Sequence, residues 1–313
     1  MSIRELLDSR GFVVIEKVLD LEEIDSVVDS MWAWFRQLSP DIKRDDMETW
    51  NDNLPFAMES KGIIQWYHAG HQQFVWDVRQ NPKVHNVFKA VWNEEKLLAS
   101  FDGINFQMPP EVTGKYSDKY GGSWWHCDQG KKKLGFQCAQ GFVNLEETTV
   151  DDGCFVCLPG SHKYHEEFLR TFSADYDNSD WIKLEEQHKL WYLKKGLQPV
   201  RVPCPKGGMV LWDSRTIHCN ASALQGRAVV RPRIAIYTCM TPRHLISKAD
   251  LRKKQKYFYE GRMTNHWPHT IKVFPKTPNM FRDKEKYETG LKRADEIYTT
   301  PILTELGREL AGF

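Results

Sequence analysis

Hydrophobic and polar positions follow two different periods along this chain, and the period changes near residue 97. Between Asp20 and Pro40 the apolar residues recur at helical spacing and form one face, and Asp20 with Glu23 has the form of a capping box. We therefore predict a long helix that begins after Asp20 and ends before Pro40. Similar patterns predict a short helix at 2–8, a strand at 11–15 and a helix at 82–92.

The part of the chain after residue 97 has the pattern of short strands separated by turns. Turn signals such as Asp151-Asp152-Gly153 and Pro159-Gly160-Ser161 divide its apolar runs. The predicted strands lie at 97–107, 140–145, 154–158, 200–202, 209–212 and 233–239. The charged and aromatic stretch 164–195 is predicted to be helical and inserted between strands.

Several short strands with tight turns, preceded by helices, predict a mainly β fold with flanking helices and a β-sandwich or jelly-roll core. We expect a single domain over 1–313, with core strands at about 97–243 and buttressing helices over 1–95. A basic, helical extension is predicted over about 246–313. Its Lys and Arg residues favour a solvated helical face over an anion site.

Charge and cysteine content narrow the class of protein. The 43 basic and 42 acidic residues give a net charge of +1, without the excess of positive charge that nucleic-acid binding requires. No run reaches about 18 apolar residues, and the N-terminus lacks the apolar stretch of a signal peptide. The seven cysteines form no disulfide framework, and we interpret the Cys154/Cys157 pair as buried strand residues rather than zinc ligands. We expect a cytoplasmic protein, monomeric or weakly homo-oligomeric, that binds neither nucleic acid nor membrane.

His126 and Asp128 are the first candidates for chemistry. In an extended segment, residues two positions apart point to the same face, so both side chains can reach one metal ion. Two such ligands need one more histidine to complete the 2-His-1-carboxylate triad of non-haem Fe(II) oxygenases. Because a His-X-Asp sequence is common by chance, the interpretation depends on what accompanies it.

His218 is the candidate third ligand, because it follows an apolar strand that begins near Gly208 and therefore belongs to a different strand. Further on, Arg231 and Arg233 open the apolar run that ends near residue 239. An arginine at the start of an inward-facing strand can form a two-pronged salt bridge with a carboxylate. The co-substrate 2-oxoglutarate requires such a partner for the carboxylate that does not bind the metal.

Several motifs occur in a defined order. They are Trp125-His126-Cys127-Asp128, Gln140 to Glu146, Asp152 through the Pro159-Gly160-Ser161-His162 turn, His218, and Arg233-Ile234-Ala235-Ile236. This ordered set resembles the phytanoyl-CoA dioxygenase family, and so does the opening stretch at 11–24. The resemblance covers residues 1 to about 243. It implies a double-stranded β-helix and an oxygenase that depends on Fe(II) and 2-oxoglutarate.

On this resemblance, His126, Asp128 and His218 match the iron ligands of the family. Arg233 matches the residue that anchors 2-oxoglutarate, and Arg231 and Arg227 are the alternatives. Asn220 stands where the family often has a small hydroxyl residue that helps to hold the same carboxylate. Gln140 and Phe142 share a strand face with Asn144 and would line the cavity beside 2-oxoglutarate; the alternative is an ordinary place in the core of a sheet.

The resemblance implies hydroxylation of a small organic molecule with Fe(II), O2 and 2-oxoglutarate, and release of succinate and CO2. Halogenating relatives lack the carboxylate that Asp128 supplies, so hydroxylation or a related oxidation is expected, with desaturation and ring formation still open. The alternatives are a non-catalytic jelly-roll protein that binds a ligand and a hydroxylase of a protein side chain. Trp66, Tyr67, His68 and His71 are candidates for a substrate-facing loop. Arg215 is expected to meet an acidic group near His218 or to form a surface salt bridge.

Overall fold

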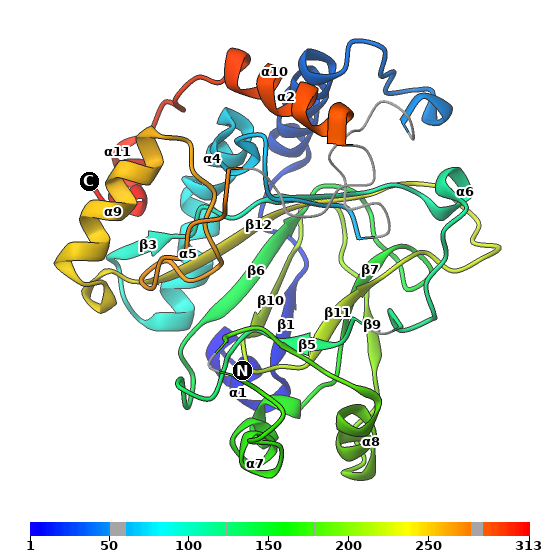
Figure 1. Cartoon of the computed structure of the whole chain (residues 1–313), viewed down its shortest axis with the longest axis vertical. Helices are drawn as coiled ribbons and strands as arrows, with labels where there is room; N and C mark the ends of the chain where they lie inside the picture. The colour runs from blue at the N-terminus through cyan, green and yellow to red at the C-terminus, as the bar shows by residue number, and fades with distance from the viewer. Residues whose placement is uncertain (51–60, 123, 178, 277–283) are drawn as a thin grey trace.

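The computed structural model describes residues 1–50, 61–122, 124–177, 179–276 and 284–313 (Figure 1). Its strands are β1 (Phe12–Ile15), β2 (Ile63–Ile64), β3 (Leu97–Ala99), β4 (Ile104–Gln107), β5 (His126–Cys127), β6 (Ala139–Asn144), β7 (Cys154–Cys157), β8 (Ile182–Lys183), β9 (Val200–Val202), β10 (Met209–Asp213), β11 (His218–Ala221) and β12 (Arg233–Pro242). Its α-helices are α1 (Ile3–Arg10), α2 (Leu21–Leu38), α4 (Gln73–Arg79), α5 (Pro82–Trp92), α6 (Pro110–Thr113), α7 (His165–Thr171), α8 (Glu186–Lys194), α9 (Lys248–Tyr259), α10 (Lys284–Ile297) and α11 (Glu305–Ala311).

The strands form two antiparallel sheets. The first has the order β1-β10-β6-β12-β4-β2, with β3 paired to β12, and the second has the order β8-β5-β11-β7-β9. Along the chain, β4, β6, β10 and β12 belong to the first sheet, while β5, β7, β9 and β11 belong to the second. The chain therefore passes back and forth between the two sheets and brings segments from distant parts of the sequence together.

The side chains of each strand alternate between two environments, as the pleat of a strand requires. On the inner face of the first sheet, Phe142, Trp212 and Ala235 pack against Phe155 and other inner residues of the second sheet. The outer face of the first sheet packs on helices α2, α4 and α5, which Figure 1 shows above and beside it. The outer face of the second sheet packs on α7 and α8. Both sheets contribute inward side chains to the space between them, and the candidate site lies there.

The N-terminal elements follow from local signals. The Glu23 carboxylate accepts a hydrogen bond of 2.7 Å from the backbone N–H of Asp20, which completes the predicted capping box of α2. Gly11 ends α1 with φ +82°, and a Cβ there would lie 2.5 Å from Thr216 Oγ1. Glycine is therefore required where α1 turns into β1.

Most predicted elements are confirmed, with three corrections. The stretch 97–107 forms two strands, β3 and β4, rather than one, because residues 100–103 interrupt the pairing with β12 between them. The stretch 164–195 contains strand β8 between helices α7 and α8. The helices hold more residues than the strands, so the prediction of a mainly β protein describes the core and not the whole of the described chain.

All seven cysteines are free and buried, and Cys154 and Cys157 lie at the two ends of β7. Among the residues that the structure describes, no helix has both the length and the apolar character needed to cross a membrane.

Candidate metal centre and active site

The pairing of β5 with β11 places His126 directly opposite His218. Their ring centroids lie 4.3 Å apart. Asp128 follows β5, and its backbone N–H donates to the carbonyl of Ser214 at 3.0 Å. Asp128 Oδ2 is 3.3 Å from His218 Nε2, and Asp128 Oδ1 is 3.9 Å from His126 Nε2. The three buried side chains each offer one ligand atom, and these atoms all lie within 4.8 Å of one another.

Backbone carbonyls hold both imidazoles in the orientation that metal binding needs. The Nδ1 atom of His126 lies 2.8 Å from the carbonyl oxygen of Trp124, and the Nδ1 atom of His218 lies 2.8 Å from that of Thr216. A carbonyl can only accept, so each Nδ1 carries the proton and each Nε2 keeps its lone pair. Both lone pairs are on the side of Asp128. This arrangement is typical of histidines that bind metal.

The charge states also suit a metal ion. Burial, and then the neighbouring His218, lower the pKa of His126 to about 4, so its imidazole is neutral at neutral pH. Burial by itself raises the pKa of Asp128. The neighbouring His266, His126 and His218 lower it by more, so the pKa of Asp128 is well below its ordinary value. Gln140 Nε2 donates to Asp128 Oδ2 at 2.8 Å and fixes the carboxylate. The site therefore presents an ionised carboxylate at Asp128 and a neutral imidazole at His126.

A cavity of about 430 Å³ opens beside these three residues. This volume lies within the range of roughly 300–1,000 Å³ that is typical of small-molecule sites. Much of its wall is aromatic, with Trp124, Trp181, Trp212, Trp267, Phe142, Phe155, Phe274 and Tyr237. Its polar lining includes Gln65, Asp102, Asp180, Asn220, Asn265, His266 and Lys272.

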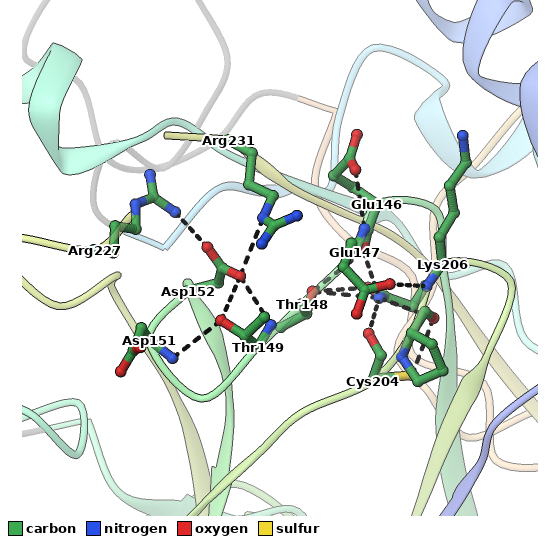
Figure 2. Close-up of polar contacts among 12 residues, drawn as sticks. Glu146, Glu147, Thr148, Thr149, Asp151, Asp152, Cys204, Lys206, Arg227 and Arg231 are labelled. Atoms are coloured by element: carbon green, nitrogen blue, oxygen red, sulfur yellow. Dashed lines mark hydrogen bonds and ion pairs between the residues drawn. The ribbon is translucent and has the colours of Figure 1, made fainter. Parts of the chain in front are cut away.

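The three candidate arginines differ in their partners. Figure 2 shows Arg227 and Arg231 on either side of Asp152, with contacts of 2.8 Å and 3.1 Å to its carboxylate. Arg227 also contacts Glu111 at 2.9 Å. Arg233 is 3% exposed, and its guanidinium lies 4.6 Å from the centre of the Phe142 ring. Within the described part of the chain, Nη1 and Nη2 of Arg233 have no hydrogen-bond partner. Arg233 is thus the one of the three whose guanidinium has no carboxylate beside it.

The structure places the other predicted residues as follows. Gln140 and Phe142 line the cavity. The side-chain amide of Gln140 donates a hydrogen bond to Asp128. Asn144, on the same strand, instead donates to the carbonyl oxygen of Cys204 at 2.7 Å and is absent from the cavity wall. Asn220 lines the cavity and donates to the Tyr237 hydroxyl at 3.3 Å. Arg215 forms an ion pair of 2.6 Å with Asp213.

The prediction of a substrate-facing loop at Trp66, Tyr67, His68 and His71 is wrong, because none of the four lines the cavity. His71 Nε2 lies 3.0 Å from the carbonyl oxygen of Arg262, and His68 stacks on Tyr298 with ring centroids 4.2 Å apart. Both imidazoles hold the C-terminal part of the chain in place. Ile63 and Gln65, just before them, are the residues of this region that reach the cavity.

Sequence reasoning missed the residues of the cavity wall that lie far from the ligands in the chain. Asp102, Trp181 and the group Asn265, His266 and Trp267 come from connecting segments, where no strand or helix period marks a buried face. No sequence signal identifies them in a single chain. Only the path of the backbone brings them to the metal centre.

Comparison with known proteins agrees with this geometry. The sequence model of the phytanoyl-CoA dioxygenase (PhyH) family matches residues 7–223. The chain belongs to this family. It is therefore an Fe(II)- and 2-oxoglutarate-dependent oxygenase of small molecules, with Fe(II) as its cofactor and 2-oxoglutarate and O2 as co-substrates.

Two relatives of this PhyH-family protein cover most of its length. It is 28% identical over 275 residues to Ava biosynthesis cluster protein O of Aspergillus versicolor, and this aligned region covers 85% of each chain. It is 22% identical over 253 residues to a putative phytanoyl-CoA dioxygenase of Dictyostelium discoideum, over 70% of each chain. Among solved structures, the non-heme alpha ketoglutarate dependent carbocyclase SnoK from nogalamycin biosynthesis superposes with a TM-score of 0.50 at 15% identity. That match covers 77% of this chain and 83% of SnoK, and it shows a shared fold.

Proposed function

We propose that His126, Asp128 and His218 hold Fe(II), that Arg233 binds the far carboxylate of 2-oxoglutarate, and that the protein hydroxylates a small molecule with release of succinate and CO2. The observation that carries the proposal is the convergence of three ligand atoms within 4.8 Å in the wall of an aromatic cavity. Two histidines and one carboxylate are the donor set of non-haem Fe(II) oxygenases, and they leave positions free for co-substrates. When bound, the iron would supply the activation of O2 that is coupled to decarboxylation of 2-oxoglutarate.

The residues around the ligands have separate tasks. The carbonyls of Trp124 and Thr216 hold the imidazoles with Nε2 free, and Gln140 holds the Asp128 carboxylate. We assign Gln140 to this orienting role rather than to direct contact with 2-oxoglutarate. Because Asp128 supplies a carboxylate, hydroxylation or a related oxidation is favoured over halogenation.

Arg233 is our choice for the 2-oxoglutarate anchor. A buried guanidinium with unpaired Nη1 and Nη2 atoms is unfavourable unless an anion completes it. A carboxylate matches the two-pronged geometry of the guanidinium. Arg227 and Arg231 already share Asp152, so neither has the same need of an anion. Asn220 and Tyr237, which bond each other on the cavity wall, are the polar neighbours that we expect beside the co-substrate.

The dimensions of the cavity favour a small substrate over a protein side chain. A cavity of about 430 Å³ is suited to a compact molecule, whereas a polypeptide substrate needs an extended groove. The relative from A. versicolor is named for a biosynthesis cluster, which also supports a metabolite as the substrate. A non-catalytic binding protein would not require the complete ligand set and its orienting hydrogen bonds.

Three finer statements belong to the same proposal. The alternation of β4 to β12 between two antiparallel sheets supports a double-stranded β-helix. Seven thiols without a disulfide support the reducing environment of the cytoplasm. A net charge of +1 supports the expectation that nucleic acid is not a partner.

The decisive experiment is an anaerobic titration of the protein with Fe(II) and 2-oxoglutarate. We expect the weak visible charge-transfer band of the iron chelate, and succinate formation after O2 is admitted. Asp128→Ala should lose both signals while its circular dichroism stays that of the parent. If the parent shows neither band nor succinate, or if Asp128→Ala retains both, the proposal fails.

A further inference from the structure

Part of the cavity wall beyond the metal ligands is built from two segments that are far apart in the sequence. One is the connection 100–103 between β3 and β4, and the other is the stretch 263–274 that follows α9. Thr264 joins them, because its N–H donates to the Phe101 carbonyl at 3.0 Å and its Oγ1 accepts from the Phe101 N–H at 3.2 Å. The stretch 263–274 also folds back on itself, with a β-bridge between Thr264 and Val273. Together these segments supply Asp102, Asn265, His266, Trp267, Lys272 and Phe274 to the cavity, and we call this wall the substrate end.

The backbone of Asp102 is held independently of its side chain. Arg79 is fully buried, and its guanidinium donates to the carbonyls of Asp102 at 2.6 Å, Gly70 at 2.5 Å and Tyr237 at 3.2 Å. A Cβ at Gly103 would lie 2.0 Å from the carbonyl oxygen of Ile64, so the chain packs there without room for a side chain. These contacts fix the direction of the Asp102 side chain and do not depend on its carboxylate.

The Asp102 carboxylate accepts fewer hydrogen bonds within the described residues than its oxygens can accept. It is buried, and the one hydrogen bond to it within the described residues is from Ser100 Oγ at 3.0 Å. An ionised carboxylate has about four acceptor positions. No lysine, arginine or histidine in the described residues forms an ion pair with it. Burial of a polar group without partners is unfavourable, so a further donor is expected.

Asp180 provides an internal comparison, because it lines the same cavity. Its carboxylate lies 2.5 Å from Lys133 Nζ and 3.7 Å from Lys272 Nζ. The carboxylate of Asp180 is therefore neutralised by the protein itself, whereas that of Asp102 is not. The difference marks Asp102 as the carboxylate in the cavity wall that is available to a ligand.

Asp102 is also electrostatically connected to the metal centre. Burial raises the pKa of Asp102, and the negative charge of Asp128 raises it further. His266 and Arg79 lower this pKa by less, so the pKa of Asp102 is above its ordinary value. His266 acts on Asp128 as well, and its Nε2 is buried without a hydrogen-bond partner in the described residues. Because Asp102 and the three metal ligands line the same cavity, a molecule bound against Asp102 shares that cavity with the metal centre. Trp124, whose ring centroid is 4.9 Å from that of His126, and Trp181, at 5.9 Å, provide flat surfaces beside it.

We propose that Asp102 is a substrate-binding residue that accepts a hydrogen bond from an N–H or O–H group of a planar, largely apolar small molecule, while the aromatic wall stacks on its rings. The inference rests on the proposed function, since it places this molecule beside the metal centre. It adds the chemical class of the substrate and the residue that orients it. The stretch 263–274 lies outside residues 7–223, which match the family model.

Matched pairs of small aromatic molecules test this proposal. The probes are indole against 1-methylindole, which differ in one N–H, and phenol against anisole, which differ in one O–H. Binding is measured by anaerobic equilibrium dialysis with the full-length protein loaded with Fe(II) and 2-oxoglutarate. In the parent, at least one donor probe should bind about tenfold more tightly than its methylated partner, as expected for a hydrogen bond to a charged group. The pair that shows the difference identifies N–H or O–H as the preferred donor.

Three variants locate the effect. Asp102→Leu, which has nearly the same shape, should reduce the ratio within the pair to about one, and Asp102→Asn, which keeps an acceptor oxygen, should retain part of it. Asp180→Asn changes the paired carboxylate in the same wall and should leave the ratio as in the parent. The inference is overturned if no probe binds, if the parent does not discriminate within either pair, or if Asp102→Leu discriminates as the parent does. The charge-transfer band of the same samples reports the metal centre separately, so a failure of the proposed function is recognised by loss of that band.

Discussion

The two ends of the cavity are built in different ways. At the metal end, His126 and His218 are direct partners on neighbouring strands, and Asp128 follows one of these strands immediately. At the substrate end, Asp102 comes from a short connection and His266 from a stretch that follows the last strand of the sheets. The first end depends on strand register, and the second depends on contacts between connecting segments.

This difference has consequences for what each end can tolerate. A shift of register by one residue turns every side chain of a strand to the other face, so the metal ligands cannot move without disruption of the sheet. The segments at the substrate end are joined by a few hydrogen bonds such as those of Thr264, and their side chains can change while the sheets stay intact. We infer that the metal end carries the reaction type and the substrate end carries the choice of substrate.

Replacement of a metal-binding residue should have the largest effect on activity, and this effect should arise at the metal end. We expect His218→Ala to reduce Fe(II) affinity and succinate formation by more than about 100-fold, because changes to residues that only support ligands already cost about 10–100-fold. Fe(II) titration and succinate release measure the two effects. His244→Ala is the matched control, since this imidazole is exposed, with 68% of its side-chain surface accessible. Equal losses in both variants would contradict the assignment of His218.

The three arginines give the next largest contrast. Arg233→Leu should raise the KM for 2-oxoglutarate by about 30-fold or more, because loss of one partner of a buried charge pair costs at least about 2 kcal/mol. Arg231→Leu should change this KM by less than about threefold, since Arg227 continues to hold Asp152. Initial rates of succinate formation at varied 2-oxoglutarate concentration measure both constants. A larger effect at Arg231 would transfer the anchoring role to that residue.

Gln140 should have a smaller effect, because it acts on the metal through Asp128. Gln140→Leu removes the amide that donates to Asp128 Oδ2 at 2.8 Å, and we expect Fe(II) affinity to fall about tenfold. Gln140→Glu removes the same donor and adds a negative charge beside Asp128, so it should be at least as harmful. The control is Gln137→Leu, a change at a glutamine whose amide donates to the Leu134 carbonyl. An unchanged affinity in Gln140→Leu would show that Asp128 does not need this support.

Much of the metal end could be predicted from the sequence because its metal-binding residues lie in short motifs on or beside strands. The alternation of a strand places His126 and Asp128 within reach of one ion, and an apolar strand leads into His218. The preference for Arg233 over Arg231 stays a prediction, which the ion pair between Arg231 and Asp152 supports. The role of Gln140 was harder to predict, because strand alternation shows that it points inward but not that Asp128 is the side chain it meets.

The substrate end could not be predicted, and the reason is physical. Its residues lie in connections, where hydrophobic periodicity carries no information about direction. His68 and His71 were natural candidates as polar aromatic residues in an irregular stretch, but their rings bond the backbone at Gly261 and Arg262. A histidine in a loop looks the same in sequence whether it contacts a ligand or a carbonyl. Only the three-dimensional path of the chain distinguishes the two.

His71 provides the last prediction, which concerns the stability of the substrate end and not the reaction. Burial, and then the nearby positive groups Arg79, His68 and Lys254, lower the pKa of His71 to about 3, and only its bond to the Arg262 carbonyl opposes this. In the unfolded chain its pKa is near the ordinary value of about 6.5. Between pH 6.5 and 3, His71 is therefore protonated in the unfolded state and neutral in the folded state. The free energy of unfolding should be constant from this source above pH 6.5 and fall by up to about 1.4 kcal/mol per pH unit below it.

Urea unfolding at pH 7.5 and pH 5 measures this loss, and His71→Phe should make the difference between the two smaller. Phenylalanine suits the site because His71 already packs edge-on against Phe101 and Phe258. Because the imidazole bonds Arg262, directly before the stretch 263–274, hydrogen exchange in that stretch should rise at pH 5 before exchange in β5 and β11 does. His244→Ala, at an exposed position, should leave both measurements unchanged. If β5 and β11 open together with 263–274 at pH 5, the two ends of the cavity are one cooperative unit, and the separation of reaction type from substrate choice loses its structural basis.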